Sequence, residues 1–589
     1  MERTEIAEKY KWKTTDVFES DEAWEKALAK LEKKIDFAHF RGTLSSAENI
    51  LAYFKAEEAF TKQAMLVYLY AYLKHDEDMR VSKYNSDVSR VIALLTRAAA
   101  ETAFVTPELT ALNGDVLDTL IADKRLKNYD YLLARVKASK AHTLSEREEV
   151  ILAQVSDPLG AAGDAFEILV NAELSLPEIE YEGKKQPLTH GLYTVIMNGR
   201  DRKLRAKAYK LYYSAYRKIL NTLATTYFGN VKKDIFYKTV RGYKSSLDMA
   251  LFEEDVDASV YERLITSVDK ATPLLHRYMA LRKRVFGYKE LHFYDIQPSM
   301  VESDTLRLDY EEAFELVIKG LSPLGEEYVA LLKKARDEGW IDVMESEGKR
   351  IGAYAIGVYG MHPFVLLNYQ KTTQDIFTIA HELGHAMHSH FSAQKQPFAK
   401  SEYKIFVAEV ASTVNETLLL KYLLQNTTDK NLRKYLLNYF MDTVRTTIFR
   451  QAQFAEFEAA AHELAEGGEP LNKDNLSDLY ASLNKKYYGP ALTYDEDIAI
   501  EWARVPHFYR SFYVYKYATG LTAAITIANR ILTEGEPAVK DYMKFLSGGG
   551  STDPVSLLKL AGVDLTKEET FAVAMKEFET ALNEFEKLA

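Results

Sequence analysis

The sequence contains no cysteine and little glycine or proline: of its 589 residues, 27 are Gly and 14 are Pro. The absence of Cys excludes disulfides, thiolate zinc sites and a cysteine nucleophile, and it is typical of a reducing compartment. The N-terminal residues 1–5 lack the apolar run of a signal peptide, and no stretch of about 18 apolar residues predicts a membrane span. We therefore expect a cytoplasmic protein.

Long blocks of basic residues are also missing, and the net charge is −11 at pH 7. This charge would repel nucleic acid, so a nucleic-acid-binding function is excluded. The apolar fraction of 47% and the charged fraction of 27% are ordinary for a globular protein, and the length is sufficient for two lobes. The composition gives no indication of the oligomeric state.

Segments with apolar residues at helical spacing fill most of the chain. The expected helical segments are residues 44–104, 107–140, 145–174, 201–222, 225–249, 257–286, 308–337, 430–465, 473–487 and 567–587. Residues 175–192 interrupt this pattern, and the alternation of Ile179 and Tyr181 with acids before Glu182-Gly183 predicts a small hairpin. We place a boundary there, between an N-terminal helical region, 1–185, and a catalytic domain, 186–589, with an uncertainty of about 20 residues.

The motif with the clearest chemistry is His381-Glu382-Leu383-Gly384-His385, within a segment, 373–391, that has a helical pattern. Positions i and i+4 share one face of a helix, so His381 and His385 can direct both imidazoles at one metal ion. Glu382 is adjacent to the first ligand and can accept a proton from a water bound to the metal. This spacing is that of a zinc-protease motif.

A catalytic zinc ion usually has a third protein ligand. The metzincin pattern requires Gly at position 388 and His at position 391, but this chain has His388 and Phe391 there. Downstream, Glu402, Glu409 and Glu416 recur every seven residues and so lie near one stripe of a helix. Glu409 has apolar neighbours and is the predicted ligand, whereas Glu416 is expected to orient a ligand histidine. Glu402 is expected to be solvated. His388 is expected to pack or to hydrogen-bond to the backbone, with a place lining the site beside the ligands as the alternative.

Two further segments are candidates for contact with substrate. Residues 350–371 combine several glycines, Gly352 among them, with an apolar strand that leads into the motif helix; the strand is Phe364-Val365-Leu366-Leu367-Asn368-Tyr369. Residues 506–520 contain one histidine, one arginine and four tyrosines. A phenol or an imidazole can donate a hydrogen bond to the oxyanion formed during amide hydrolysis. A half-buried packing helix is the alternative interpretation of the tyrosine-rich segment.

Several motifs together resemble oligoendopeptidases F, of the thimet oligopeptidase family of zinc peptidases. They are Gly352-Ala353-Tyr354, Leu367-Asn368-Tyr369, His381–His388, Phe406–Glu409, His507-Phe508-Tyr509 and Phe512–Gly520. The resemblance implies a mainly α, two-lobed, almost all-helical zincin-type fold, with a small β element beside a deep substrate channel. It also implies one Zn²⁺ per chain and cleavage of short peptides.

The resemblance assigns roles to the two candidate segments. It implies that the strand 364–369, with Gly352 nearby, pairs with the peptide backbone by β-augmentation. It also implies that His507 and a tyrosine face the oxyanion. The spacing from His507 ranks Tyr515 and Tyr517 ahead of Tyr513.

The leading hypothesis is a zinc-dependent endopeptidase that hydrolyses internal bonds of short, unstructured oligopeptides with a metal-activated water and Glu382 as general base. A carboxypeptidase on the same scaffold is one alternative, with Arg510 as the cation for the substrate carboxylate. Cleavage of a peptide blocked at both ends would exclude it. A non-catalytic peptide-binding protein is the other alternative, but binding alone has no use for Glu382.

Overall fold

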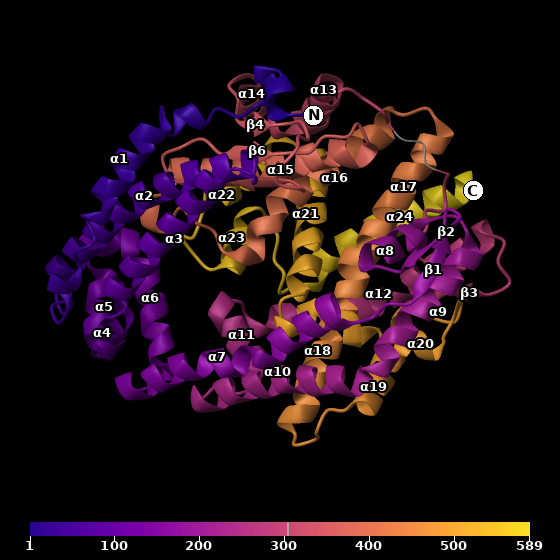
Figure 1. Ribbon diagram of the computed structural model, residues 1–589, viewed down its shortest axis with the longest axis horizontal. Helices are drawn as coiled ribbons and strands as arrows, with labels where there is room; N and C mark the ends of the chain where they lie inside the picture. The colour runs from indigo at the N-terminus through magenta and orange to yellow at the C-terminus, as the bar shows by residue number, and fades with distance from the viewer. Residues whose placement is uncertain (303–305) are drawn as a thin grey trace. The chain divides into compact units, whose positions relative to one another are not determined.

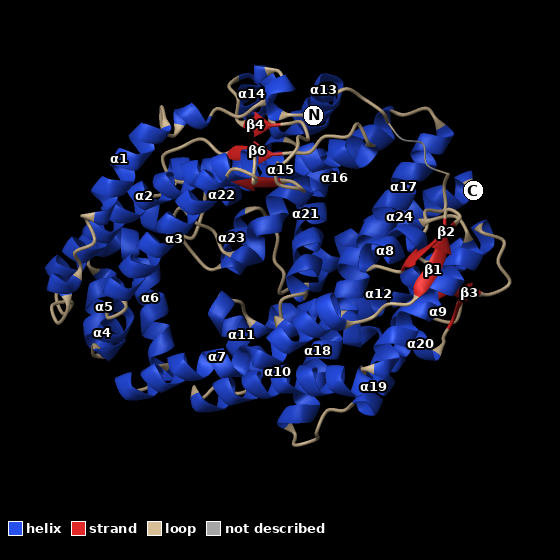
Figure 2. Ribbon diagram, viewed as in Figure 1, coloured by secondary structure: helices blue, strands red, loops and turns tan. Residues whose placement is uncertain are grey.

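The computed structural model describes residues 1–302 and 306–589. Helices make up most of it, and the strands are short (Figure 2). The predicted mainly α fold is therefore confirmed. Within the described residues, no helix combines the length and the apolar character needed to cross a membrane. The chain forms two compact units, each assembled from three stretches of sequence.

Unit 1 comprises Met1–Thr143, Thr305–Tyr422 and Ile527–Val563. Its core joins side chains of the N-terminal helices, such as Trp24, Phe54 and Leu117. The elements that lie in unit 1 or begin there are α1 (Asp21–Glu32), α2 (Ala47–Glu77), α3 (Ser82–Thr102), α4 (Val105–Ala111), α5 (Gly114–Ala122), α6 (Asp130–Ser139), α13 (Tyr310–Leu321), α14 (Glu326–Asp337), β4 (Ile341–Asp342), β5 (Tyr354–Ile356), β6 (Phe364–Leu366), α15 (Thr373–Lys395), α16 (Ala408–Asn426), α22 (Glu536–Leu546) and α23 (Pro554–Leu560).

Unit 2 comprises Leu144–Asp304, Leu423–Thr526 and Asp564–Ala589. Its longest helices pack side by side, with α12 against α19 and α24, and α7 against α10 (Figure 1). The elements that lie in unit 2 or begin there are α7 (Glu146–Ile168), β1 (Glu178–Tyr181), β2 (Lys184–Pro187), α8 (His190–Asn198), α9 (Arg202–Lys218), α10 (Leu220–Val240), α11 (Ser246–Glu254), α12 (Ala258–Val285), β3 (Leu291–His292), α17 (Lys430–Val444), α18 (Arg450–Glu466), α19 (Lys473–Tyr488), β7 (Leu492–Thr493), α20 (Glu496–Ala499), α21 (Tyr515–Glu534) and α24 (Glu568–Leu588).

The hairpin expected within 175–192 is present as the antiparallel pair β1–β2. Glu182 and Gly183 connect the strands with φ values of 52° and 74°, the left-handed conformations that a tight two-residue hairpin turn requires. The predicted boundary near residue 185 falls inside unit 2. The spatial units differ from that single division, because unit 1 draws on three separate stretches of the chain.

A three-stranded sheet in unit 1 has the order β4-β6-β5. β6 pairs in parallel with β4 and antiparallel with β5, so it is the central strand. Its residues Phe364 and Leu366 are buried against Trp12, Leu69 and Leu73, which belong to the N-terminal segment and α2. This packing fixes the sheet directly before α15.

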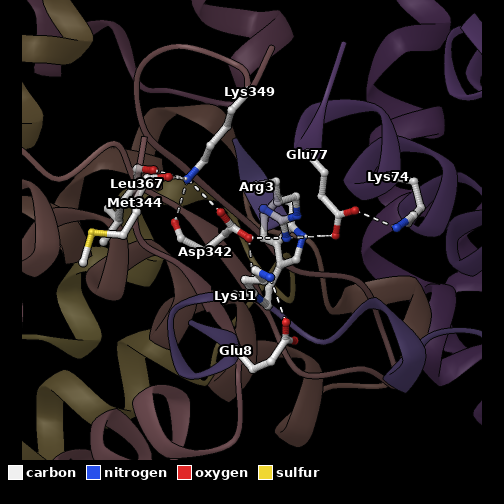
Figure 3. Close-up of polar contacts among 10 residues, drawn as sticks. Arg3, Glu8, Lys11, Lys74, Glu77, Asp342, Met344, Lys349 and Leu367 are labelled. Atoms are coloured by element: carbon white, nitrogen blue, oxygen red, sulfur yellow. Dashed lines mark hydrogen bonds and ion pairs between the residues drawn. The ribbon is translucent and has the colours of Figure 1, made fainter. Parts of the chain in front are cut away.

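A network of buried charges ties the N-terminal segment to this sheet (Figure 3). Arg3 forms ion pairs with Asp342 at 2.6 Å and with Glu77 at 3.1 Å. The fully buried Lys349 ammonium lies 2.7 Å from the other carboxylate oxygen of Asp342 and donates a 2.6 Å hydrogen bond to the carbonyl of Leu367. Lys349 therefore joins β4 to the segment that follows β6. Buried charges of this kind are tolerated only when they are paired.

Candidate active site

α15 carries the His-Glu-Leu-Gly-His motif and begins in a capping box. The Thr372 side chain accepts a hydrogen bond from the Asp375 amide (3.1 Å), and the Asp375 carboxylate accepts one from the Thr372 amide (2.8 Å). The buried apolar side chains of the helix are Ile376, Phe377, Ile379, Ala380, Leu383, Ala386, Met387 and Phe391. They anchor α15 and leave His381 and His385 partly exposed.

α16 approaches α15 closely because residue 384 is a glycine. A Cβ atom at Gly384 would lie 2.5 Å from the Cα of Ser412 and 2.7 Å from the carbonyl oxygen of Ala411. The fully buried Asn415 side chain reinforces this contact, since its amide donates to the Ala380 carbonyl at 2.9 Å. The small residues of α16 thus bring its acidic side chains to the histidines.

The two histidines and Glu409 form a compact triangle. The Nε2 atoms of His381 and His385 are 3.2 Å apart, and each lies 3.4 Å from Oε2 of Glu409. A tetrahedral zinc ion with bonds of about 2.0–2.1 Å separates its ligand atoms by about 3.3–3.4 Å. The triangle therefore has the dimensions of three corners of a zinc tetrahedron, and the donor set fits the ion. Within the described residues, it is the one group of at least three such side chains that could hold a metal ion.

Glu416 and Ser412 orient the ligand side chains. The Glu416 carboxylate accepts a hydrogen bond from Nδ1 of His381, which leaves Nε2 directed at the triangle. The Ser412 hydroxyl donates to Oε2 of Glu409 at 3.2 Å. Burial opposes a charge on His381, but the hydrogen bonds to Glu409 and Glu416 outweigh it and raise the pKa of His381 to about 10. Although burial acts in the opposite direction, the two histidines hold the pKa of Glu409 below its usual range.

Glu382 is outside the ligand triangle and has a different environment. Its side chain is 7% exposed, and burial raises the pKa of this carboxyl despite the neighbouring histidines. It lines a cavity of about 460 Å³ together with Gly352, Ala353 and residues 367–369. A carboxyl with a raised pKa beside a cavity and a ligand set is suited to accept and return a proton.

The structure corrects the prediction that the strand 364–369 forms the edge for a bound peptide. Residues 364–366 are buried, and both sides of β6 are already paired. The Asn368 amide donates to the Gly352 carbonyl at 2.8 Å, and the Tyr369 hydroxyl donates to the Leu308 carbonyl at 2.8 Å, so both side chains fix local structure. Phe364, Val365, Leu366 and Leu367 are core residues, each at most 2% exposed.

The sheet has two edge strands, β4 and β5. The N-terminal segment lies beside β4, where the Val343 amide donates to the Tyr10 carbonyl at 2.9 Å, so β5 is the candidate edge for a peptide. The amides of Val365 and Leu367 donate hydrogen bonds to carbonyls of the β4 segment. Because backbone groups alternate in direction along a strand, the amides and carbonyls of residues 364 and 366 in β6 are directed toward β5. In β5, Tyr354 lies opposite Leu366 and Ile356 lies opposite Phe364. The backbone amides and carbonyls of Tyr354 and Ile356 therefore bond to β6 within the sheet. The amide and carbonyl of Ala355 are therefore directed toward the outer edge.

His388 packs in the core, in agreement with the preferred of its two interpretations, and does not lie beside the ligands. It is fully buried, its ring stacks on Tyr403 at a centroid distance of 3.7 Å, and Phe545 lies 5.0 Å away on α22. Burial lowers the pKa of His388 to about 3, which keeps the ring neutral. Its position one turn beyond His385 rotates it onto the packed side of α15, so it serves the core.

The histidine and tyrosines near the C-terminus belong to unit 2. The His507 ring lies 6.4 Å from that of Tyr513 and 6.0 Å from that of Tyr517, and the two tyrosine rings are 5.4 Å apart. Tyr515 is 1% exposed and packs against Tyr261 at 5.2 Å. The ranking of Tyr515 ahead of Tyr513 is therefore corrected, because the helical twist turns Tyr515 into the core.

The turn before α21 is held in a strained conformation. Phe512 has a φ of 57°, unusual for a residue other than glycine, and its amide donates to the buried carboxyl of Glu458 at 3.0 Å. The Arg510 guanidinium lies 4.1 Å from the centre of the Tyr513 ring. This turn fixes the positions of His507 and the two tyrosines within unit 2.

Sequence reasoning missed three residues that shape the site. Gly384 permits the close approach of the helices, Asn415 hydrogen-bonds across them, and Ala355 supplies the outward backbone groups of β5. The small residues between Glu409 and Glu416 carried a signal for the first two. The sequence around Ala355 gave no such signal, because the free backbone groups of a strand can be identified only once the central strand of the sheet is known.

A His-His-Glu cluster on two helices, with a buried carboxyl beside it in a mainly α fold, defines a helical metallopeptidase. Comparison with known proteins agrees. The chain belongs to peptidase family M3: the sequence profile of that family matches residues 195–577, and a profile described as Oligopeptidase F matches residues 108–175. The predicted resemblance is thereby confirmed, and so is the prediction that the chain is a metalloendopeptidase.

Individual relatives extend over the whole chain. It is 40% identical to Oligopeptidase PepF of Bacillus subtilis (strain 168), across 100% of this chain and 88% of that protein. It is 39% identical to Group B oligopeptidase PepB of Streptococcus agalactiae serotype III (strain NEM316), across 100% and 98%. Among solved structures, oligoendopeptidase-F from Enterococcus faecium matches with a TM-score of 0.73 and 34% identity, covering 96% of this chain and 99% of that one. A protein from Chlamydophila abortus with a peptidase designation matches with a TM-score of 0.94 and 35% identity over both full chains.

Proposed function

We propose that the chain is a zinc-dependent endopeptidase that hydrolyses internal bonds of short, unstructured oligopeptides. The observation that carries this proposal is the triangle of His381, His385 and Glu409, whose edges of 3.2–3.4 Å fit a single zinc ion. When bound there, zinc would supply a Lewis acid that polarises the scissile carbonyl and lowers the pKa of the attacking water. We also propose a cytoplasmic location, which accords with the lack of cysteine.

Glu382 moves the proton in this mechanism. Its carboxylate accepts a proton from the attacking water and then delivers it to the leaving amine. Burial raises the pKa of Glu382, which makes the carboxylate a better proton acceptor. Glu416 keeps the proton of His381 on Nδ1, so that Nε2 remains available as a ligand.

The peptide backbone pairs with the edge of β5 through Ala355. This strand lies next to the cavity that contains Glu382, since Gly352 and Ala353 of the preceding turn line the same cavity. Backbone pairing requires an extended segment, so a folded substrate would first have to unfold. His507, Tyr513 and Tyr517 are the proposed hydrogen-bond donors to the oxyanion, and their clustering within unit 2 supports this role.

The test separates metal binding from proton transfer. Glu382→Gln should retain one zinc ion per chain but lose about 10²- to 10⁴-fold in kcat on a peptide blocked at both ends. Glu326→Gln is the control, because it makes the same change in charge at an exposed position. A zinc-loaded Glu382→Gln variant with native kcat would contradict the mechanism. Failure of the wild-type enzyme to cleave the blocked peptide would contradict the endopeptidase assignment.

A further inference from the structure

A second cavity in unit 1, of about 630 Å³, lies along α15 beyond the ligand triangle. Ser389 and Ala393 of α15 line it, and so does Ala408, the residue before Glu409. Ser389 follows His385 by four residues, which is about 6 Å along the same helix face. The cavity therefore starts one helical turn from the second metal ligand.

The cavity also adjoins the end of the peptide-pairing strand. Gly357 directly follows β5 and lines the cavity, and a Cβ atom there would lie 2.6 Å from the Cβ of Ser389. The end of β5 thus packs closely on α15. A peptide extended along the β5 edge by a few more residues, at about 3.4 Å per residue, would bring one of its side chains to the opening.

Aromatic rings form two walls of the cavity. Phe54 and Tyr129 stack at 4.5 Å, and Tyr359 packs edge-on against Phe398 at 5.4 Å. The Lys62 ammonium already lies 4.7 Å from the centre of the Tyr359 ring and 5.2 Å from that of Phe398. The second wall thus accommodates a cation within the protein itself.

Two carboxylates at the cavity, Glu57 and Glu402, form no ion pair among the residues that the structure describes. The nearby cations have other partners: Lys62 pairs with Glu58 at 2.6 Å, and Lys400 pairs with Asp130 at 2.5 Å. The cavity therefore carries an excess of negative charge. Burial raises the pKa of Glu57, and a cation entering the cavity would compensate that cost.

The glycine triplet before α23 holds one wall in place. A Cβ atom at Gly549 would lie 2.2 Å from the Lys400 carbonyl oxygen, and one at Gly550 would lie 2.4 Å from that of Glu402. The Gly550 amide donates to the Lys400 carbonyl at 2.8 Å. The backbone that carries Glu402 is thus fixed by close packing, and Glu402 is one of the residues that line the cavity.

We propose that this cavity is a specificity pocket for a lysine or arginine side chain of the bound peptide, resting on the peptidase function proposed above. The aromatic walls contact the aliphatic stem of that side chain, and Glu57 and Glu402 receive its charge. The pocket makes cleavage favourable when a basic residue stands at one fixed distance from the scissile bond.

The experiment uses the zinc-loaded full-length enzyme and peptides blocked at both ends that share one scissile bond. A single lysine is moved through every other position, and norleucine, which has a similar stem but no charge, replaces it in a matched series. We expect one position at which kcat/KM for lysine exceeds that for norleucine about tenfold. In the double variant Glu57→Gln/Glu402→Gln, the ratio of kcat/KM for lysine to that for norleucine should fall to about one. The control double variant Glu48→Gln/Glu326→Gln, which has the same change in net charge at exposed sites, should keep the wild-type ratio.

Glu402→Lys is a second variant, at an exposed position. It should shift the preference at that position from lysine toward glutamate. The pocket is overturned if no position prefers lysine, or if the preference survives the double glutamine variant. Lack of cleavage of every peptide would instead contradict the proposed function. The pocket is then tested separately by calorimetry, since the Glu382→Gln variant should bind the lysine peptide more tightly than the norleucine peptide.

Discussion

Gly384→Ala tests whether the contact between α15 and α16 sets the geometry of the metal site. The new Cβ would lie 2.5 Å from the Cα of Ser412, whereas ordinary contacts begin at 3.4 Å, so the helices must separate by 3.4 − 2.5 = 0.9 Å. Such a shift moves Glu409 away from both histidines and lengthens edges that are now 3.4 Å. Overpacking of this kind costs about 1–3 kcal/mol in the free energy of unfolding.

We expect zinc affinity to fall about 10- to 100-fold, the range observed when groups that orient metal ligands are removed. Competition with a chromogenic chelator measures the affinity, and urea denaturation measures the stability. Gly160→Ala is the matched control, because Gly160 lies within α7 with no neighbouring atom inside 4 Å. It should be neutral or stabilise the protein by up to about 1 kcal/mol. Native zinc affinity and stability in Gly384→Ala would refute the argument.

Other predictions concern the buried charges, the oxyanion donors, the metal ligands and the folding state of the substrate. Asp342→Asn should destabilise unit 1 by about 3–5 kcal/mol, because Lys349 would be left as a buried unpaired charge. Ion pairs outweigh burial and hold the pKa of Asp342 in the folded protein below its ordinary value. The stability that ionised Asp342 contributes is therefore fully present above a pH of about 4 and is lost as the pH falls through the pKa of the folded state. Midpoints of urea denaturation measured across this pH range test the prediction. Tyr517→Phe should lower kcat with little change in zinc content. Tyr515→Phe should instead alter the stability of the protein. Equal losses of kcat in the two variants would contradict the proposed roles. Zinc affinity should increase with pH up to the His381 pKa of about 10, because a proton competes with the metal, and a flat titration would exclude this linkage. One scissile sequence placed in short peptides and in a stably folded host should be cleaved only in the peptides, and equal kcat/KM values would contradict binding of an extended segment.

Local patterns in the sequence were sufficient to predict the helix of the motif and the acids of the next helix. The spacing of His381 and His385 depends only on helical periodicity, and the seven-residue spacing of Glu409 and Glu416 places both on one side of α16. The structure brings all four side chains together through the Gly384 contact. Such features are predictable because a single helical period determines them.

Features that depend on contacts distant in sequence were not predictable. The apolar run at 364–367 is typical of a central strand buried on both faces, but the family resemblance assigned it the role of a substrate edge. Only pairing with β4 and β5 identifies it as central. Tyr515 was misplaced for a related reason. Spacing gives the angle of a residue around a helix, but the packed side of the helix is known only once a partner such as Tyr261 is in place.

The assembly of unit 1 from three stretches has a consequence for how the enzyme is made. The buried side of the metal-binding helix is completed by α22, where Phe545 lies beside His388, and by Gly549 and Gly550 near Lys400. These residues leave the ribosome well after the ligand histidines, because Phe545 follows His385 by about 160 positions. A nascent chain that has already exposed its two ligand histidines therefore still lacks the packing that fixes them. Synthesis must therefore pass Gly550 before the metal-binding helix is fully packed, and a chain released earlier would lack the complete site.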